Sequence, residues 1–289
     1  MFTYLILHYK NADVTEQCLD SLLKPDSQDS NMVVVDNASN NGSYEKLLEK
    51  YGANKRIHFI KNEENLGYAA GNNVGFRYAK ETLGADWIVL LNNDVVVEQK
   101  DFQKTVLEEY KKHSFYLAGP DIVTPEGNSQ NPYLMECPDK KAIRKKLLHD
   151  YIVLGLMKIH LQQAIKKLLH YDGSIFQPNE TPTIEDFHGV LHGSCLIFSP
   201  DFIREFNGLY GGTFLYCEEE ILCYILNKLN CRYTYLKSVQ VIHKHSVSMK
   251  REIKDENRRK ELELSRRIVS YKKFLKIAKA EKEIGDFLR

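Results

Sequence analysis

The sequence predicts an α/β protein with a mostly parallel, mixed sheet flanked by helices. Two observations lead to this class. Short apolar runs that suit strands alternate with segments of helical periodicity through the first half of the chain. The runs also contain few polar residues, which is typical of strands buried on both faces. A chain of 289 residues is long enough for one large domain with an appendage.

The first half of the chain contains four predicted strands, and two of them lead into an acid. The strands are expected at residues 2–8, 32–35, 57–60 and 87–91. Helices are expected at 14–22 and 44–51, and Asp13 with Glu16 resembles a capping box that starts the first helix. Because parallel strands end at one edge of a sheet, Asp36 and Asp94 are predicted to share that edge.

The second half begins with a basic, amphipathic segment at residues 137–185. A strand at 194–198 follows, and Ser199 is predicted to cap a helix with Pro200 at its first position. A further helix is expected from about Glu218, then two strands at 232–236 and 239–243. The last forty residues have the pattern of a charged amphipathic helix.

The composition excludes several classes of protein. The 40 basic and 39 acidic residues balance, so we expect no nucleic-acid partner. The six cysteines form no CxxC pair, and the N-terminus starts in a predicted strand with no signal peptide, so we expect a reduced, cytoplasmic setting. Apolar runs such as 151–157 are too short to span a bilayer, which leaves only peripheral membrane association.

Asn92-Asn93-Asp94 interrupts an apolar run at the predicted end of a strand. Ligands of open α/β sheets bind beyond the carboxyl ends of strands, and a carboxylate there suits a hard divalent cation that also binds phosphates. A polar turn between two strands is an equally good interpretation of this segment alone.

Residues 65–75 form a glycine- and asparagine-rich loop that leads into a helix. Glycines let a ligand approach the backbone, and a helix N-terminus favours a phosphate. The loop contains neither GxGxxG nor GxxxxGK[ST], which disfavours hydride-transfer and NTPase functions. The alternative is a glycine-bearing helix packed tightly on the sheet.

Glu218, Glu219 and Glu220 begin a predicted helix. Helical spacing places the first two toward the buried face and Glu220 toward solvent. A buried acid is a candidate general base, because desolvation raises its pKa, although acids are also common in first turns for dipole reasons. His243 ends a predicted strand and is a candidate metal or phosphate ligand, with His245 and His192 as competitors.

In chain order, these segments closely resemble the family 2 glycosyltransferases, with the rhamnosyltransferase-type enzymes of bacterial surface polysaccharide synthesis as the nearest branch. The resemblance covers roughly residues 2 to 248. It implies a GT-A fold, a nucleotide-sugar donor, a divalent cation (Mg²⁺ or Mn²⁺) and inverting transfer. The residues it implies for donor binding are Asp36, Asn65, Gly71, Asn73, Asn93 and His243, the metal ligands are Asp94 and His243, and the base is Glu219 or Glu218.

At two positions the sequence departs from the family pattern, which limits how far the family's residue roles can be assigned to it. The usual aspartate base is replaced by Glu219, which leaves the base open between Glu218 and Glu219. The acid commonly found two residues later is Ile221, so that position is not catalytic here. A non-catalytic nucleotide-sugar-binding or scaffold homologue is therefore the alternative. A nucleotidyltransferase is disfavoured, because no glycine-rich phosphate loop follows the first strand.

The resemblance also suggests a division of the chain. We expect a glycosyltransferase domain at 1–248 with a basic helical insertion at 137–185, and a C-terminal helical extension at 249–289. The donor would be a UDP- or dTDP-sugar and the acceptor a glycan or a lipid-linked saccharide. Residues 140–171 are basic and amphipathic, so they suit either an anionic membrane at the inner face of the cell or a packing helix with solvated lysines. The sequence leaves homo-oligomer formation open.

Overall fold

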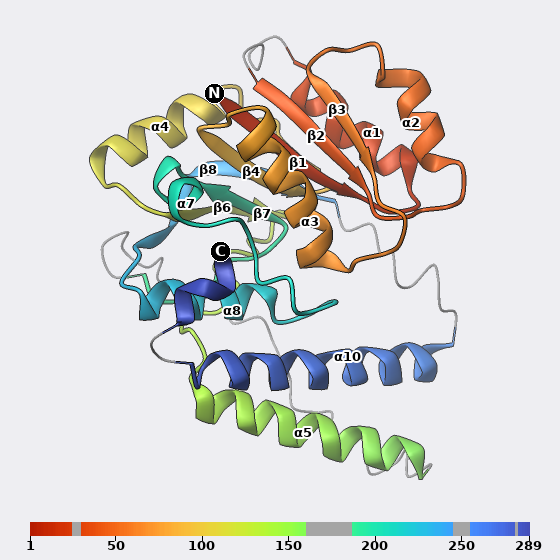
Figure 1. The fold of residues 1–289 in the computed structure, drawn as a ribbon, viewed down its shortest axis with the longest axis vertical. Helices are drawn as coiled ribbons and strands as arrows, with labels where there is room; N and C mark the ends of the chain where they lie inside the picture. Colours follow the sequence, from red (N-terminus) through yellow and green to blue (C-terminus); the bar gives the residue numbers. More distant parts are fainter. Residues whose placement is uncertain (25–29, 160–186, 245–254, 281–282) are drawn as a thin grey trace.

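The computed structural model describes residues 1–24, 30–159, 187–244, 255–280 and 283–289. An eight-stranded sheet with the strand order β3-β2-β1-β4-β7-β6-β8-β5 forms its centre (Figure 1). The strands are β1 (Phe2–His8), β2 (Ser30–Asp36), β3 (Ile57–Lys61), β4 (Trp87–Asn92), β5 (Val95–Val96), β6 (Leu117–Val123), β7 (Cys195–Phe198) and β8 (Tyr233–His243). The α-helices are α1 (Ala12–Leu22), α2 (Ser43–Tyr51), α3 (Tyr68–Arg77), α4 (Phe102–Lys112), α5 (Lys140–Lys158), α7 (Pro200–Glu205), α8 (Glu218–Lys228) and α10 (Glu256–Ile277), with a π-turn η2 (Tyr78–Thr82) and a 3-10 turn η4 (Ile284–Leu288).

Helices cover both faces of the sheet, because the side chains of each strand alternate between the two faces. Tyr4 and Ile6 of β1 pack with α1, α2 and α4 in one apolar core. Leu5 of the same strand packs with α3, α7, α8 and α10 in the other. The predicted class is therefore confirmed, and the unbroken apolar runs of β1, β2 and β4 are buried on both sides as expected.

The sheet is parallel in its first half and mixed in its second. Strands β1 to β4 pair in parallel, which brings Asp36 opposite His8 and Leu7 opposite Asn92 at one edge. Strand β7 is antiparallel to both β4 and β6, and β5 is antiparallel to β8. Asp36 and the Asn92–Asp94 segment thus meet at the same edge of the sheet, as predicted.

The expected pair of strands at 232–236 and 239–243 is one strand, β8. Its pairing with β6 slips at this position: Leu236 is opposite Pro120, and Gln240 is opposite Asp121. Residues 237–239 lie between these two pairs, and they interrupt the alternation of apolar residues that had predicted two separate strands. The irregularity lets one strand pair with β6 and then also reach β5.

Helices α5 and α10 form a separate layer, in which α10 lies between α8 and α5 (Figure 1). The buried Asp150 carboxylate accepts a 2.7 Å hydrogen bond from Arg267, which joins α5 to α10. Tyr224 of α8 packs on Phe274 of α10 with ring centroids 4.8 Å apart. The amphipathic helices predicted in the basic segment and near the C-terminus are therefore present as α5 and α10, while residues 160–185 of the predicted basic segment and the 245–248 segment lie outside the described residues.

Two local predictions about helix ends have different outcomes. Ser199 caps α7, because its side chain accepts a hydrogen bond from the Phe202 amide, and Pro200 is the first helical residue. The capping box is wrong: α1 begins at Ala12 after Asn11, and no side chain caps it. Asp13 and Glu16 instead bind Lys46 of α2 at 2.6 and 3.0 Å, which links two neighbouring helices.

Candidate active site

Asp94 and His243 lie side by side where the β4–β5 turn meets the end of β8. The short ladder between β5 and β8 places Val95 opposite His243, and the Lys244 amide donates a 2.9 Å hydrogen bond to the Asp94 carbonyl. Both side chains are largely buried, and His243 Nε2 lies 3.2 Å from Asp94 Oδ1. Backbone pairing thus brings together two residues that are far apart in the sequence.

The chemistry of this pair suits a divalent cation. The amide oxygen of buried Gln130 lies 2.8 Å from His243 Nδ1 and accepts a hydrogen bond from it. This bond orients the ring so that Nε2 points at the Asp94 carboxylate, as second-shell partners orient metal-binding histidines. Within the described residues no group of three or more His, Cys, Asp or Glu side chains surrounds a metal position, so the remaining ligands would be water and phosphate oxygens.

Asp36 is fully buried at the end of β2. Its carboxylate accepts hydrogen bonds from the amide and the hydroxyl of Ser39, and His8 Nε2 lies 3.9 Å away. Burial lowers the pKa of His8 to about 4, so the ring is neutral at pH 7. Asp36 therefore shapes the loop after β2 through its hydrogen bonds to Ser39.

A chain of hydrogen bonds connects Asn93 to this region. Asn93 donates to the Thr15 hydroxyl at 3.0 Å, and Thr15 lies 2.8 Å from His8 Nδ1. The other ring nitrogen of His8 lies 2.8 Å from the Ser43 hydroxyl. Sequence patterns did not single out Thr15 or His8, because neither belongs to a motif and both act only through their position in the fold.

Asn37 directly follows β2, and its side chain is hydrogen-bonded to the glycine- and asparagine-rich loop at 65–75, although the sequence did not single it out. Its side-chain nitrogen donates to Asn65 Oδ1 and to the Gly67 carbonyl, both at 3.0 Å. Its oxygen accepts from the Leu66 amide at 3.0 Å. A Cβ atom at Gly71 would lie 3.2 Å from the Asn37 amide, so that glycine permits close packing at the start of α3.

Asn73 binds the loop after α7 rather than the 65–67 loop. Its amide donates to the Leu209 carbonyl at 2.7 Å and accepts from the Leu209 amide at 2.8 Å. Gly208, at φ +126°, lies directly against this side chain. The structure thus brings Asn65 and Gly71 together around Asn37, and it places Asn73 where it fixes the loop that leads toward α8.

Glu218 and Glu219 begin α8 after two residues in the left-handed region, Tyr216 and Cys217, at φ +75° and +71°. This turn directs the first turn of α8 toward the 193–194 loop. The Glu219 side chain lies against Gly193, where a Cβ atom would overlap its carboxylate. The Tyr68 hydroxyl donates a 2.6 Å hydrogen bond to the Gly193 carbonyl.

Electrostatics distinguishes this group of acids from ordinary surface glutamates. Desolvation raises the pKa of Glu219, and the charges of Glu218 and Glu220 raise it further. Desolvation also raises the pKa of Glu218. Burial raises the pKa of Tyr68, with smaller contributions from Glu219, Glu218 and Asp94, so its hydroxyl lies within the field of both acidic groups. The desolvation of Glu219 therefore outweighs the opposing effect of the helix N-terminus.

Glu220 is buried, so the prediction that it points to solvent is wrong. Its carboxylate lies 3.7 Å from Lys146 of α5, which covers this side of α8. A helical wheel of α8 could not show this cover, because α5 is distant in the sequence.

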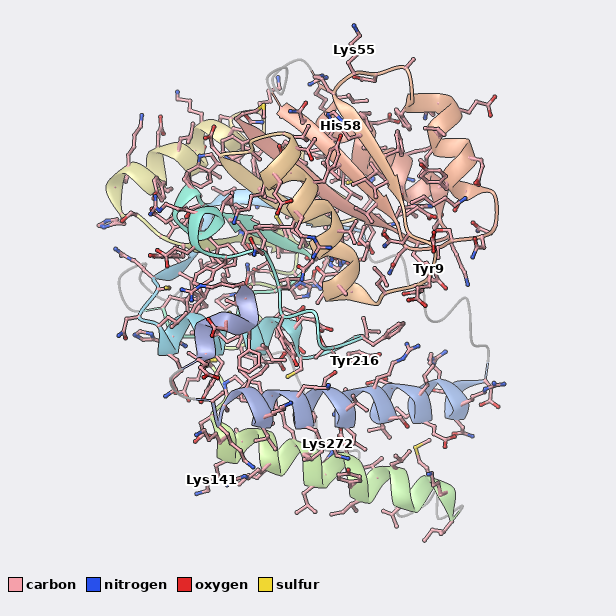
Figure 2. The ribbon with its side chains drawn as sticks, in the orientation of Figure 1. Tyr9, Lys55, His58, Lys141, Tyr216 and Lys272 are labelled. Carbon is pink, nitrogen blue, oxygen red and sulfur yellow. The ribbon has the colours of Figure 1, made fainter. Side chains whose placement is uncertain are left out.

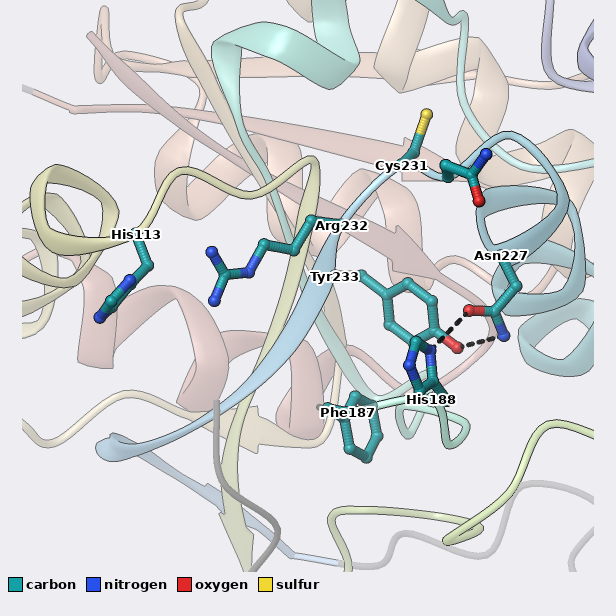
Figure 3. A pocket seen from close by; sticks show the side chains of 8 residues that line it. His113, Phe187, His188, Asn227, Cys231, Arg232 and Tyr233 are labelled. Carbon is teal, nitrogen blue, oxygen red and sulfur yellow. Dashed lines mark hydrogen bonds between the residues drawn. The ribbon is translucent and has the colours of Figure 1, made fainter. Parts of the chain in front are cut away.

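A cavity of about 500 Å³ lies at the other end of β8 and α8 (Figure 3). It is lined by His113, Phe187, His188, Asn227, Asn230, Cys231, Arg232 and Tyr233. Tyr233 begins the strand that ends at His243, which separates the cavity from Asp94 by about 30 Å. The cavity is not part of the candidate active site.

The chain is similar in sequence to known glycosyltransferases. The model of the family Glycosyl transferase family 2 matches residues 3–169. The chain is 25% identical over 249 residues to the low-salt glycan biosynthesis hexosyltransferase Agl10 of Haloferax volcanii, covering 86% of this chain and 68% of that protein. It is also 25% identical over 181 residues to the rhamnosyltransferase WbbL of Escherichia coli, covering 61% of this chain and 60% of that protein.

Solved structures share the fold. TarS 1–349 of S. aureus superposes with a TM-score of 0.52 at 14% identity, covering 84% of this chain and 60% of that one. The mannosyltransferase PcManGT of Pyrobaculum calidifontis, solved with GDP-Man and Mn²⁺, gives a TM-score of 0.54 at 12% identity, covering 97% of this chain and 73% of that one. The fold is that of the GT-A glycosyltransferases. No helix in the described ranges is both long and apolar enough to cross a membrane.

Proposed function

The chain belongs to glycosyl transferase family 2, and from this premise we propose that it transfers a sugar from a nucleotide-diphosphate sugar to a saccharide acceptor with inversion at the anomeric carbon. The observation that carries the proposal is the position of Glu219. This partly buried acid with a raised pKa lies against the Gly193 loop, and the Tyr68 hydroxyl lies within its field and that of Asp94. A base for the acceptor hydroxyl and a carboxylate that could hold a cation against the leaving diphosphate are what a single displacement needs.

In the proposed mechanism Glu219 accepts the proton of an acceptor hydroxyl as its oxygen attacks the anomeric carbon. The nucleoside diphosphate leaves from the opposite face, so one displacement inverts the configuration. The raised pKa makes Glu219 a stronger base than an exposed glutamate once it is ionised. The backbone at Gly193 lies against this carboxylate, and the Tyr68 hydroxyl holds that backbone in place through its hydrogen bond to the Gly193 carbonyl.

Asp94 and His243 would hold Mg²⁺ or Mn²⁺, which would neutralise the charge that develops on the leaving diphosphate. Gln130 orients the His243 ring for this role. Asp36, Asn65, Gly71, Asn73 and Asn93 are proposed to shape the donor site, in part through Asn37 and Thr15.

The donor is proposed to be a UDP- or dTDP-sugar. Solved relatives of this fold hold UDP, UDP-GlcNAc or GDP-Man, which supports a nucleotide-sugar donor without selecting the base. The acceptor is proposed to be a glycan or lipid-linked saccharide at the inner face of the cell membrane. It would approach Glu219 from the side of the loop before α8, where Tyr216 lies above α10 (Figure 2).

Glu219→Gln tests the base assignment, and Glu220→Gln is its matched control. Both changes neutralise an acid of the same helical turn, but only Glu219 lies against Gly193. We expect Glu219→Gln to lower kcat by about 10²- to 10⁴-fold with unchanged donor affinity, and Glu220→Gln to keep near-normal kcat. Equal losses in the two variants, or a larger loss in Glu218→Gln, would contradict the assignment.

Asp94→Asn tests the phosphate and metal role by calorimetry of UDP binding with and without Mn²⁺. We expect Mn²⁺ to tighten UDP binding in the unmodified protein and to have little effect in the variant. If the unmodified protein binds nucleotide sugars yet neither transfers nor hydrolyses them, the alternative of a non-catalytic nucleotide-sugar-binding homologue replaces the proposed enzyme.

A further inference from the structure

The outward face of α5 combines basic and apolar side chains in one continuous stripe. The exposed residues follow helical spacing and are Lys141, Arg144, Lys145, Leu148, Tyr151, Ile152, Gly155, Lys158 and Ile159. The apolar members are 62% (Leu148), 43% (Tyr151), 44% (Ile152) and 62% (Ile159) exposed. The stripe is basic in its first turns and apolar in the next, with Lys158 at the far end.

The fold does not use this face. Helix α5 packs on the rest of the protein through its opposite side, where Ile143 and Val153 are fully buried and Asp150 binds Arg267. Half of the ten exposed large hydrophobic residues in the described part of the chain lie on α5, its C-cap and α10. A concentration of this kind marks an interaction surface.

Helix α10 extends the same surface. Val269 is 51% exposed, and Lys272 and Lys276 are exposed one and two turns further on. The Lys272 ammonium lies 5.4 Å from the centre of the Tyr151 ring, so the stripes of the two helices are contiguous (Figure 2). We call this surface, formed by the α5 stripe with Val269, Lys272 and Lys276, the basic-apolar face.

Charge selects the class of partner. The sole carboxylate within α5 is Asp150, which is buried, so the α5 part of the basic-apolar face carries positive charge with no exposed acid. A second copy of the chain would place two such faces against each other, and like charges in an interface oppose binding. Anionic phospholipid offers negative headgroups for the lysines and an apolar interior for Leu148, Ile152 and Ile159.

We propose that the basic-apolar face docks the protein on an anionic phospholipid membrane, with α5 lying in the plane of the interface. The functional consequence rests on the proposed function. Helix α10 contacts the loop before α8 directly, since Ser270 donates a 3.0 Å hydrogen bond to the Leu215 carbonyl and Arg266 stacks on Phe214 at 4.7 Å. Docking through α5 and α10 therefore places the Glu219 side of the site close to the membrane, where a lipid-linked acceptor lies.

Co-sedimentation of the full chain with vesicles tests the docking without donor or acceptor. We expect binding to vesicles that contain phosphatidylglycerol, weak binding to pure phosphatidylcholine, and release at high salt. Lys141→Gln/Arg144→Gln/Lys145→Gln should weaken binding about 100-fold, since each basic residue near an anionic surface contributes a factor of about five. The matched control, Lys100→Gln/Lys104→Gln/Lys111→Gln on and beside α4, removes the same charge from a distant surface and should bind as the unmodified protein does.

Insertion of the apolar part of the α5 stripe into the lipid can be measured separately by tryptophan fluorescence. The chain has 1 tryptophan, Trp87, which is buried. A tryptophan introduced by Leu148→Trp should be quenched by brominated lipid, while Trp87 in the unmodified protein should not. Leu148→Ser/Ile152→Ser should weaken vesicle binding about tenfold or more through lost apolar burial.

Three results would overturn the proposal. The first is no binding to anionic vesicles at low salt, and the second is an equal loss of vesicle binding in the α4 control variant. The third is a protein that does not bind vesicles but forms a concentration-dependent dimer, which Leu148→Ser/Ile152→Ser abolishes. Donor binding, measured separately by thermal shift with UDP and Mn²⁺, keeps the two proposals distinct. A protein that binds donor but not vesicles refutes the docking and leaves the proposed transfer standing.

Discussion

Replacing Gly193 with alanine should slow sugar transfer about 100-fold while the protein stays folded and binds its donor. A Cβ atom at this position would lie 2.9 Å from Glu219 Cδ and 3.0 Å from Cγ, and it would overlap Oε1. Since ordinary van der Waals contact begins at 3.4 Å, the carboxylate oxygen has to retreat by about 1 Å. A displacement of this size can cost about 10² in rate, or about 2.7 kcal/mol of activation free energy.

The assay is steady-state kinetics with a soluble acceptor, or donor hydrolysis where no acceptor is known, together with a thermal melt. We expect a fall in kcat with little change in the donor KM. Gly155→Ala is the control, because nothing lies within 4 Å of its Cβ position, and it should leave kcat unchanged and slightly stabilise α5. Near-normal kcat in Gly193→Ala would refute the claim that the position of Glu219 against this loop matters for the reaction.

Three further outcomes are expected. Burial raises the pKa values of the two glutamates that begin α8, so the folded state holds protons that the unfolded state releases. Urea unfolding at several pH values should therefore show that the free energy of unfolding falls as pH rises from about 4.3 toward the raised pKa values. The fall should be less steep in Glu218→Gln, which has lost one of the two groups. Tyr68→Phe removes the 2.6 Å hydrogen bond to the Gly193 carbonyl and should cost about 1–3 kcal/mol by urea unfolding and lower kcat; unchanged values would contradict a positioning role. Asp150→Asn breaks the buried bond to Arg267 and should cost about 3 kcal/mol, whereas an unchanged unfolding midpoint would mean that α5 is held by apolar packing alone.

Sequence periodicity predicted the central strands well, because strands buried on both faces have continuous apolar runs. It also predicted that Asp36 and the Asn92–Asp94 segment would lie at one edge of the sheet, since parallel pairing leaves no other arrangement. The capping box that it predicted for α1 is absent, because Asp13 and Glu16 have partners in α2 that spacing within one helix does not show.

The surroundings of the site residues could not be predicted from the sequence, because they are formed by contacts between segments that lie far apart in the chain. Gln130 precedes a proline-containing loop and carries no motif, yet it orients His243. Tyr68 could have been noticed in the sequence, because its hydroxyl stands at the first position of the helix within the glycine-rich segment. Its partner Gly193, however, is 125 residues away in the chain. Glu220 was misplaced for the same reason, since its cover comes from Lys146.

The two-residue ladder between β5 and β8 makes the spacing of Asp94 and His243 independent of the length of the chain that connects them. The distance between Asp94 and His243 is set by strand register, not by any loop, and the shift in pairing with β6 at Pro120 comes before β8 reaches that ladder. The chain between these residues, including α5 and the loop before α8, can therefore diversify in length and sequence without disturbing the spacing of the two side chains. Under the proposed function, evolution can therefore change the acceptor side of the site while the spacing of Asp94 and His243 is kept.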